Sequence, residues 1–306
     1  MAILRSIKNF VKTVFPFPVW VGLRSLYWRL RGLSSDTFYD SMVRKAGRLA
    51  PVHNGPLISI LCNTWNTPSG YLEQMLLSIR QQSYRNWELL INNCSDPGHP
   101  EVKRILRAFS EKDDRIKVFN LENLGISLNT NAVAARASGE FILLMDHDDF
   151  LTPDALESLM AAQKQKNADF VYSDEYYLRM SCNLVLYRRK MPFSMEALES
   201  DNYVNHPALI RKTLFDQVHG FRTGFEGSQD YDLYLRLFEQ TDNIAYVPKG
   251  LYVWRIHPVS FSQSALQHCI DSGKKALEEH FKRIGVPAVV ESAKNEARFK
   301  VVLLKK

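Results

Sequence analysis

The chain has 306 residues, 45% of them hydrophobic, which is long enough for one large domain with a buried core. Its formal net charge is +6, but residues 1–50 alone hold nine Lys and Arg against two Asp, a net of +7. The rest of the chain therefore lacks the basic surface of a general nucleic-acid binder, and we expect no nucleic-acid partner.

Residues 1–50 are predicted to form a basic amphipathic arm. Apolar residues recur at helical spacing through residues 3–15, with basic residues between them. The longest uncharged run, residues 13–23, has 11 residues, whereas a membrane span needs about 20. Two interpretations stay open for residues 1–33. They lie on the inner face of the cell membrane and make the protein a peripheral cytoplasmic one, or they pack on the body or on a partner.

Strand and helix patterns alternate in residues 55–175. Short apolar runs predict strands, which cover residues 56–62, 86–92, 115–120, 141–145 and 169–173. Helical spacing of apolar residues predicts helices between the strands, at residues 71–83, 101–109, 127–138 and 153–165. This alternation predicts an α/β fold with a mainly parallel sheet that helices cover on both faces.

The pattern loosens in residues 176–262, where we expect the second half of the same domain. Helices are predicted at residues 211–221 and 228–240, and two strands at residues 243–248 and 251–255. A long helix over residues 264–285 and a short β tail are predicted for the C-terminal segment, residues 263–306.

Polar residues follow three of the predicted strands, at residues 63–66, 92–95 and 146–149. In sheets of this kind, ligands bind at the carboxyl ends of the strands. We therefore expect these three segments to converge on one cleft.

The third segment contains three aspartates, Asp146, Asp148 and Asp149. Phe150 and Leu151 stand where a calcium loop and a phosphatase motif need other residues, so both are excluded. The chain contains neither a P-loop nor a G-x-G-x-x-G motif. One remaining interpretation is that the aspartates form a solvated turn whose carboxylates cap the next helix. The other interpretation is a site where carboxylates hold Mg²⁺ or Mn²⁺ together with a diphosphate.

Five motifs occur in the order found in family-2 glycosyltransferases of GT-A fold. They are ISILCNTWNTP, NLGISLNTNAVAARASGEFILLMDHDD, DFVYSDE, GFEGSQDYDLYLR and YVWRIHP. The chain resembles this family over roughly residues 56–285, and above all its bacterial polysaccharide and O-antigen (rhamnosyltransferase-like) branch. The resemblance implies a single GT-A (Rossmann-like) α/β domain with a mainly parallel mixed sheet. Residues 55–175 would bind the nucleotide-sugar, and residues 176–262 would bind the acceptor and carry catalysis.

The implied activity is metal-dependent, inverting transfer of a sugar from a nucleotide-diphosphate-sugar to a glycan acceptor, for which we expect a lipid-linked glycan. One carboxylate takes the proton of the attacking hydroxyl, and a cation carries the charge on the leaving diphosphate. The implied general base is Asp230. The implied ligands of Mn²⁺ or Mg²⁺ are Asp146, Asp148 and His257, with Asp149 either a substitute ligand or a helix cap.

The remaining candidate residues divide between the donor and the acceptor. Those on the donor side are Thr64, Trp65, Asn66, Asn93, Asn123, Gly125, Asn131 and Asp146. Those on the acceptor side are His206, Asp232 and Asp174.

The chain departs from the family after the second strand, where Asn92 or Asn93 replaces an expected acid. An amide is neutral, so the identity of the nucleotide stays open. Another class of function is a catalytically silent transferase-like subunit that scaffolds a glycan-assembly complex, and a second glycosyltransferase subunit is an expected partner in either case. A nucleotide-sugar hydrolase or pyrophosphorylase is a further alternative, which no basic phosphate loop supports.

Overall fold

The computed structural model describes residues 35–257, 265–293 and 296–304. The helix predicted within residues 1–33 lies outside this part. The rest of the arm forms helix α3 (Ser35–Ala46), which contacts strand β7 (Leu184–Arg188) at the edge of the sheet. None of the helices in the described ranges combines the length and apolar character needed to cross a membrane.

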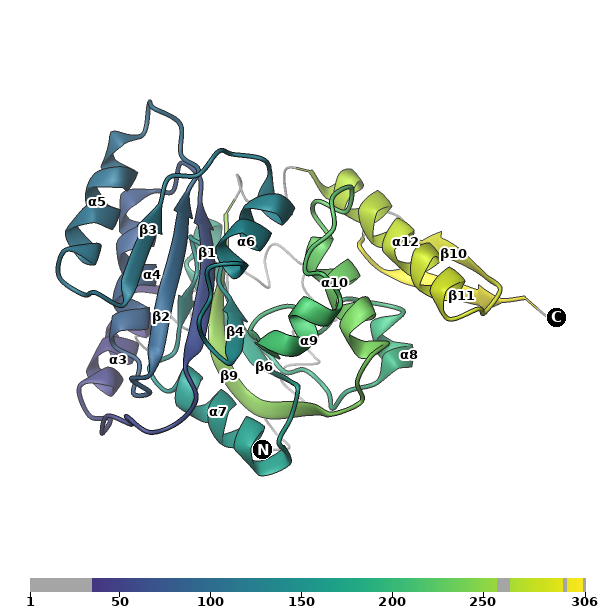
Figure 1. The fold of residues 1–306 in the computed structure, drawn as a ribbon, viewed down its shortest axis with the longest axis horizontal. Coiled ribbons are helices and arrows are strands. Elements are labelled where there is room, and N and C mark those ends of the chain that lie inside the picture. Colours follow the sequence, from purple (N-terminus) through teal and green to yellow (C-terminus); the bar gives the residue numbers. More distant parts are fainter. Residues whose placement is uncertain (1–34, 258–264, 294–295, 305–306) are drawn as a thin grey trace, which may run out of the picture.

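A nine-stranded sheet forms the centre of the described part of the chain (Figure 1). The strands lie in the order β3-β2-β1-β4-β8-β6-β9-β5, with β7 paired to β6. Four strands in the first half are parallel: β1 (Ile58–Thr64), β2 (Trp87–Asn93), β3 (Ile116–Phe119) and β4 (Phe141–Leu144). The others make the sheet mixed: β5 (Phe150–Leu151), β6 (Phe170–Arg179), β8 (Ala208–Arg211) and β9 (Ile244–Ile256).

Helices cover both faces of the sheet (Figure 1). On one face lie α4 (Ser69–Arg80), α5 (Pro100–Ser110) and α7 (Ala155–Lys166). On the other lie α6 (Ile126–Ala134), α9 (Lys212–Gln217) and α10 (Gln229–Phe238). Strand β4 shows how one strand packs against the helices on both faces of the sheet. Its Phe141 and Leu143 pack under the first set of helices, and Ile142 and Leu144 under the second, because successive side chains of a strand alternate between faces.

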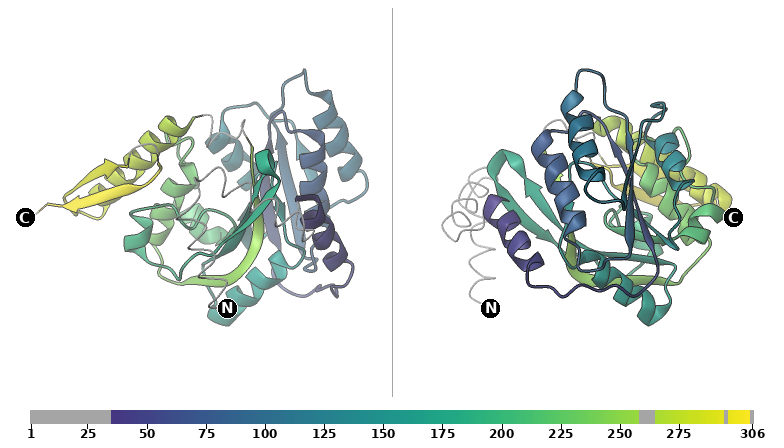
Figure 2. Two further views of the ribbon diagram at one scale, coloured as in Figure 1. Left: turned by 180° about the vertical axis from the view of Figure 1, so that it is seen from behind. Right: turned by 60° about the vertical axis from the view of Figure 1, so that its left-hand side comes forward.

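The C-terminal segment forms a separate layer against α10, at one end of the molecule (Figures 1 and 2). It consists of α12 (Leu266–Arg283) and an antiparallel hairpin of β10 (Ala288–Ser292) and β11 (Phe299–Leu303). The remaining short elements are the 3-10 helix η1 (Met180–Cys182) and α8 (Met195–Leu198).

Several strands differ from the sequence prediction. Strands β5, β7 and β8 were not predicted. The two strands predicted at residues 243–248 and 251–255 are a single strand, β9. A register shift opposite Ser173 and Asp174 of β6 accommodates Pro248 and Gly250 within this strand. Gly250 is needed there because a Cβ atom would lie 2.4 Å from the ring of Tyr176.

Gly139 provides a test of the packing at the start of β4. A Cβ atom on Gly139 would lie 2.7 Å from both the Leu57 carbonyl oxygen and the Ser59 backbone nitrogen. We expect Gly139→Ala to lower the free energy of unfolding in urea by about 1–3 kcal/mol, because both neighbours are backbone atoms of β1 or its approach. Gly98→Ala is the matched control, since no atom lies within 4 Å of its added Cβ. Equal stabilities of the two variants would contradict this account.

Candidate functional site

The three polar segments that follow β1, β2 and β4 meet at one edge of the sheet. Asn66 Nδ2 donates a hydrogen bond to Asp96 Oδ2 (2.7 Å), which joins the first segment to the second. Thr67 Oγ1 lies 2.9 Å from His147 Nδ1, which joins the first to the third. The parallel register of β1 and β2, with Thr64 opposite Asn93, produces this convergence.

Asp148 is paired with a residue from the far end of β9. Its Oδ2 lies 2.8 Å from Nε2 of His257, the residue that follows β9. Burial raises the pKa of this carboxyl, but the hydrogen bond from His257 and the nearby rings of His147 and His257 lower it overall. The Asp148 carboxylate is therefore held ionised beside an imidazole.

Asp146 is directed toward His206, which precedes β8. Asp146 Oδ2 lies 3.3 Å from His206 Nε2, and the His206 ring stacks on Tyr252 with centroids 5.1 Å apart. Burial lowers the pKa of His206, but Asp146, and then Asp230 and Asp149, raise it to about 9. His206 is therefore cationic at neutral pH. The Asp146 side chain keeps 46% of its surface exposed, so it is open to a ligand.

Asp149 points into the protein. Its carboxylate accepts hydrogen bonds from the Arg255 backbone nitrogen (2.7 Å) and the Tyr252 hydroxyl (2.8 Å), and the residue is 1% exposed. Burial and the neighbouring charges of Asp148 and Asp146 raise its pKa well above the usual value. These contacts hold the acidic loop on β9. Asp154, and not Asp149, occupies the N-terminal cap position of α7.

Asp230 lies in the first turn of α10 and faces the same region. Its carboxylate accepts hydrogen bonds from Asn202 Nδ2 (3.0 Å) and the Tyr231 backbone nitrogen (2.8 Å). Burial raises the pKa of Asp230, the charge of His206 opposes the rise, and that of Asp146 adds to it. The segment whose Asn202 binds this carboxylate also holds His206, which lies 3.3 Å from Asp146 of the acidic loop.

The predicted donor-side residues surround the ends of β1 and β2. Thr64 Oγ1 donates to Asn93 Oδ1 (3.2 Å), and Asn93 Nδ2 donates to Asn120 Oδ1 (3.2 Å). Trp65 is 57% exposed and presents an open aromatic face. Asn66 adopts φ 49°, which an asparagine tolerates better than most residues.

The loop before α6 is organised by asparagines. Asn123 Oδ1 accepts from the Gly125 backbone nitrogen (3.3 Å) and from Asn129 Nδ2 (2.9 Å). Gly125 has φ 89°, a conformation that favours glycine, and it caps the helix. Asn131 instead clamps the backbone of Phe221, donating to its oxygen (2.8 Å) and accepting from its nitrogen (2.9 Å). Both polar atoms of the Asn131 amide group therefore have partners in the backbone of the loop before α10.

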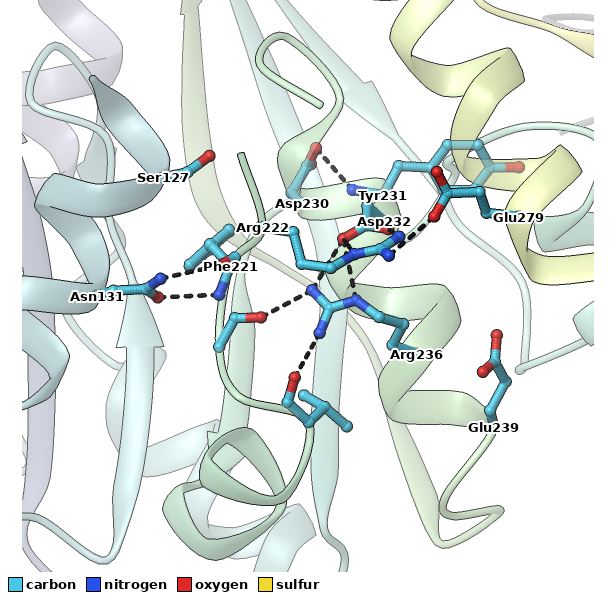
Figure 3. Close-up of polar contacts among 12 residues, drawn as sticks. Ser127, Asn131, Phe221, Arg222, Asp230, Tyr231, Asp232, Arg236, Glu239 and Glu279 are labelled. Carbon is cyan, nitrogen blue, oxygen red and sulfur yellow. Dashed lines mark hydrogen bonds and ion pairs between the residues drawn. The ribbon is translucent and has the colours of Figure 1, made fainter. Parts of the chain in front are cut away.

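Two residues predicted on the acceptor side are buried in other contacts. The Asp232 carboxylate binds the guanidinium groups of Arg222 and Arg236, and Figure 3 shows Asp230 pointing away from this group. Arg236 also donates to two backbone carbonyls of the preceding loop, and Arg222 lies 2.8 Å from Glu279 of α12.

Asp174 is likewise 0% exposed and accepts from the Lys190 backbone nitrogen (2.7 Å) and the Tyr246 hydroxyl (2.6 Å). The structure gives both carboxylates structural partners in place of an open position. Of the three acceptor-side candidates, only His206 joins Asp146 and Asp230.

Sequence reasoning missed three residues of this region. Asn202 donates a hydrogen bond to Asp230. Tyr252 donates one to Asp149 of the acidic loop and stacks on the His206 ring. The guanidinium carbon of Arg255 lies 4.1 Å from the centre of the Tyr71 ring. Asn202 lies in the same short segment as His206, and this nearness in sequence could have indicated that Asn202 belongs to the site. Tyr252 and Arg255 lie inside an apolar strand and could only be found from the fold.

A divalent cation fits part of this arrangement. In the described ranges no group of three or more His, Cys, Asp and Glu is arranged to hold a metal ion. Asp148 and His257 nevertheless provide an oxygen and a nitrogen ligand in contact, with the open Asp146 carboxylate in the same loop. Two or three protein ligands are enough for Mg²⁺ or Mn²⁺ when phosphate oxygens and water fill the remaining coordination positions. The donor set therefore fits a cation that is shared with a phosphorylated ligand.

Comparison with known proteins gives matches in sequence. The family model for glycosyl transferase family 2 matches residues 59–226. The uncharacterized protein y4gI of Sinorhizobium fredii is 36% identical over 83% of this chain and 30% of its own length. The O-antigen biosynthesis protein RfbC of Myxococcus xanthus is 33% identical over 80% of this chain and 19% of its own. The chain thus spans less than a third of either relative.

Solved structures match in fold. Staphylococcus aureus TarS 1-349 in complex with UDP-GlcNAc has a TM-score of 0.56 at 17% identity, over 72% of this chain and 65% of that one. The mannosyltransferase PcManGT of Pyrobaculum calidifontis, in complex with GDP-Man and Mn²⁺, has a TM-score of 0.57 at 16% identity, over 86% and 78%. At these identities the likeness is one of fold.

Asp232→Asn tests the structural role of the contacts in Figure 3. We expect a loss of about 3–5 kcal/mol in the free energy of unfolding, because Arg236 would be left buried without its charge partner. Asp216→Asn, at an exposed pair with Lys212, is the control and should change stability by less than about 0.5 kcal/mol. A loss no larger than that of the control, measured by urea denaturation, would show that Asp232 has no such role.

Proposed function

Since the chain belongs to glycosyl transferase family 2 and has the GT-A fold, we propose that it is a metal-dependent, inverting glycosyltransferase. The observation that carries this proposal is the meeting of two acidic centres at one edge of the sheet. The Asp148–His257 pair forms one, and Asp230 in α10 forms the other. Residues 202–206 link the two centres, since Asn202 donates a hydrogen bond to Asp230 and His206 lies 3.3 Å from Asp146, in the same loop as Asp148.

The donor is proposed to bind where β1, β2 and β4 end. Asp148, His257 and Asp146 would hold Mn²⁺ or Mg²⁺. A bound cation there supplies positive charge that stabilises the departing nucleoside diphosphate. The Mn²⁺ and GDP-Man in the Pyrobaculum enzyme support a cation and a nucleotide-sugar here.

Asp230 is proposed to be the general base. In an inverting transfer the acceptor hydroxyl attacks the anomeric carbon from the face opposite the diphosphate, so one carboxylate must take the hydroxyl proton. A carboxylate with a raised pKa accepts a proton more readily than an exposed one. No covalent intermediate is required.

The proposed pathway is the biosynthesis of a cell-surface polysaccharide, with a glycan, in particular a lipid-linked one, as acceptor. The names of two relatives support this class: the O-antigen biosynthesis protein RfbC and, at 27% identity, the chondroitin synthase of Escherichia coli. Attachment to the inner face of the membrane through residues 1–33, and docking to a second transferase subunit, stay predictions from the sequence.

A thermal-shift experiment tests whether the chain binds a nucleotide through a metal. The wild type is heated with UDP, GDP or dTDP, each with and without Mn²⁺. We expect one nucleotide to stabilise the fold only when Mn²⁺ is present, by about 2.7 kcal/mol at 100 times its dissociation constant. Asp148→Asn should remove the effect of the metal, because a neutral amide is a weaker ligand. If no nucleotide stabilises the wild type and Mn²⁺ has no effect, the enzyme proposal fails.

Asp230→Asn tests the proposed base. We expect kcat for release of the nucleoside diphosphate to fall by about 10²–10⁴-fold, because the amide cannot take the proton. Binding of the nucleotide with Mn²⁺ should be unchanged. If cells that contain the Asp230→Asn or Asp148→Asn variant make normal glycan, the scaffold alternative is correct.

The pH profile checks the same assignment. Asp230 must be ionised to act as a base, so kcat/KM should decrease as the pH is lowered through its pKa. Because this pKa is raised, the decrease should begin at a higher pH than it would for an exposed aspartate. Asn202→Ala removes a hydrogen bond that favours the ionised form and should move this limb further up. A limb that does not move would count against Asp230 as the base.

A further inference from the structure

Residues 202–206 connect the two acidic centres. Asn202 Nδ2 donates to Asp230 Oδ2 at 3.0 Å, on the side of α10. His206 Nε2 lies 3.3 Å from Asp146 Oδ2, on the side of the acidic loop. The position of this one segment therefore sets both contacts.

The segment has no helix or strand of its own, since it runs from α8 to the start of β8. Its backbone is instead bound by side chains from other elements. Lys190 Nζ donates to the carbonyl oxygens of Val204 and His206, each at 2.6 Å. The hydroxyl of Tyr234, in α10, donates to the carbonyl oxygen of Asn205 at 2.9 Å. Three successive carbonyl groups are thus held from outside.

Lys190, which follows β7, is a buried cation with defined partners. Its side chain is 0% exposed, and Nζ lies 3.4 Å from Oε2 of Glu175, which is also fully buried. Burial lowers the pKa of Lys190 to about 8, against the opposing effect of Glu175, so the ammonium form prevails at neutral pH. A buried ammonium is costly unless its N–H groups are bonded. The two carbonyls and the carboxylate meet that need together, which fixes the backbone of residues 204–206 relative to β6 and β7.

We propose that Lys190 is a positioning residue of the transfer site. It holds residues 202–206 so that Asn202 meets Asp230 and His206 meets Asp146. The effect of Lys190 on sugar transfer rests on the proposed function. The hydrogen bonds by which Lys190 holds residues 204–206 do not depend on that proposal. Lys190 acts through the segment and does not itself touch a substrate.

Hydrogen exchange followed by mass spectrometry tests the hold on the segment. In Lys190→Met the amides of residues 201–206 should exchange at least about 10-fold faster than in the wild type, because two external bonds to this backbone are lost. Lys212→Met, which removes a lysine from an ion pair with the exposed Asp216, is the control and should leave these amides unchanged. Unchanged exchange in Lys190→Met would overturn the proposal, whatever the activity.

Kinetics test whether the hold matters to transfer. For Lys190→Met we expect kcat for nucleoside-diphosphate release to fall by about 100-fold, since a displacement of about 1 Å at a catalytic group has this effect. The dissociation constant of the nucleoside diphosphate chosen by thermal shift, measured with Mn²⁺, should rise by much less than kcat falls, because Lys190 reaches the metal site only through His206 and Asp146, while Asp148 and His257 keep their own contact. Weaker nucleotide binding with an unchanged kcat would contradict the positioning role.

A second variant covers the case in which Lys190→Met does not fold. Lys190→Gln keeps N–H donors without the charge, and it should show smaller changes in the same direction in exchange and in kcat. Equality of Lys190→Gln with the wild type in both readouts would overturn the proposal. A wild type that releases no nucleoside diphosphate from any sugar donor would instead overturn the proposed function, and hydrogen exchange would still decide whether Lys190 holds the segment.

Discussion

The carboxylates of the proposed site depend on the cationic side chain of His206. His206 contacts Asp146, and the charges of Asp146, Asp230 and Asp149 raise the pKa of His206 to about 9 although burial lowers it. The charge of His206 in turn opposes the rise that burial causes in the pKa of Asp230. Carboxylates that approach one another without such a cation would take up protons, and a base or a metal ligand would be lost. The neighbouring residues serve to keep His206 in place. Tyr252 stacks on its ring, and Lys190 binds its carbonyl group.

The fold brings these groups together from distant parts of the chain. Parallel strands place the acidic loop and the asparagine-rich segments at one sheet edge, and β9 returns His257 to within 2.8 Å of Asp148. Helix α10 then supplies Asp230 from its first turn, while Asp232 anchors the helix to Arg222 of the preceding loop and pairs with Arg236 of the same helix. The groups proposed to bind the donor and the group proposed to take the proton thus lie on different elements, and each is fixed by its own contacts.

Much of this could be predicted from the sequence, for physical reasons. Buried parallel strands are continuous apolar runs, so β1, β2 and β4 were predicted near their observed limits. The pairing of Asp148 with His257, 109 residues apart, could not come from spacing and was implied only by the resemblance to the family. Asp232 was predicted on the acceptor side, but its carboxylate binds Arg222 and Arg236, because residues i and i+2 of a helix do not share a face and Asp232 points away from Asp230. The buried contacts of Asp149 with Tyr252 and Arg255 depend on the pairing of β5 with β9, which no local pattern encodes.

The central claim is that Asp148 and His257 hold a metal beside Asp230 at one edge of the sheet. A crystal structure with Mn²⁺ and the nucleoside diphosphate that stabilises the protein, recorded at the manganese absorption edge, tests it most directly. The account predicts an anomalous peak within bonding distance of the Asp148 carboxylate and the His257 ring, with the diphosphate on the side that faces His206 and Asp230. A peak elsewhere, or a nucleotide bound away from the ends of β1, β2 and β4, would contradict it.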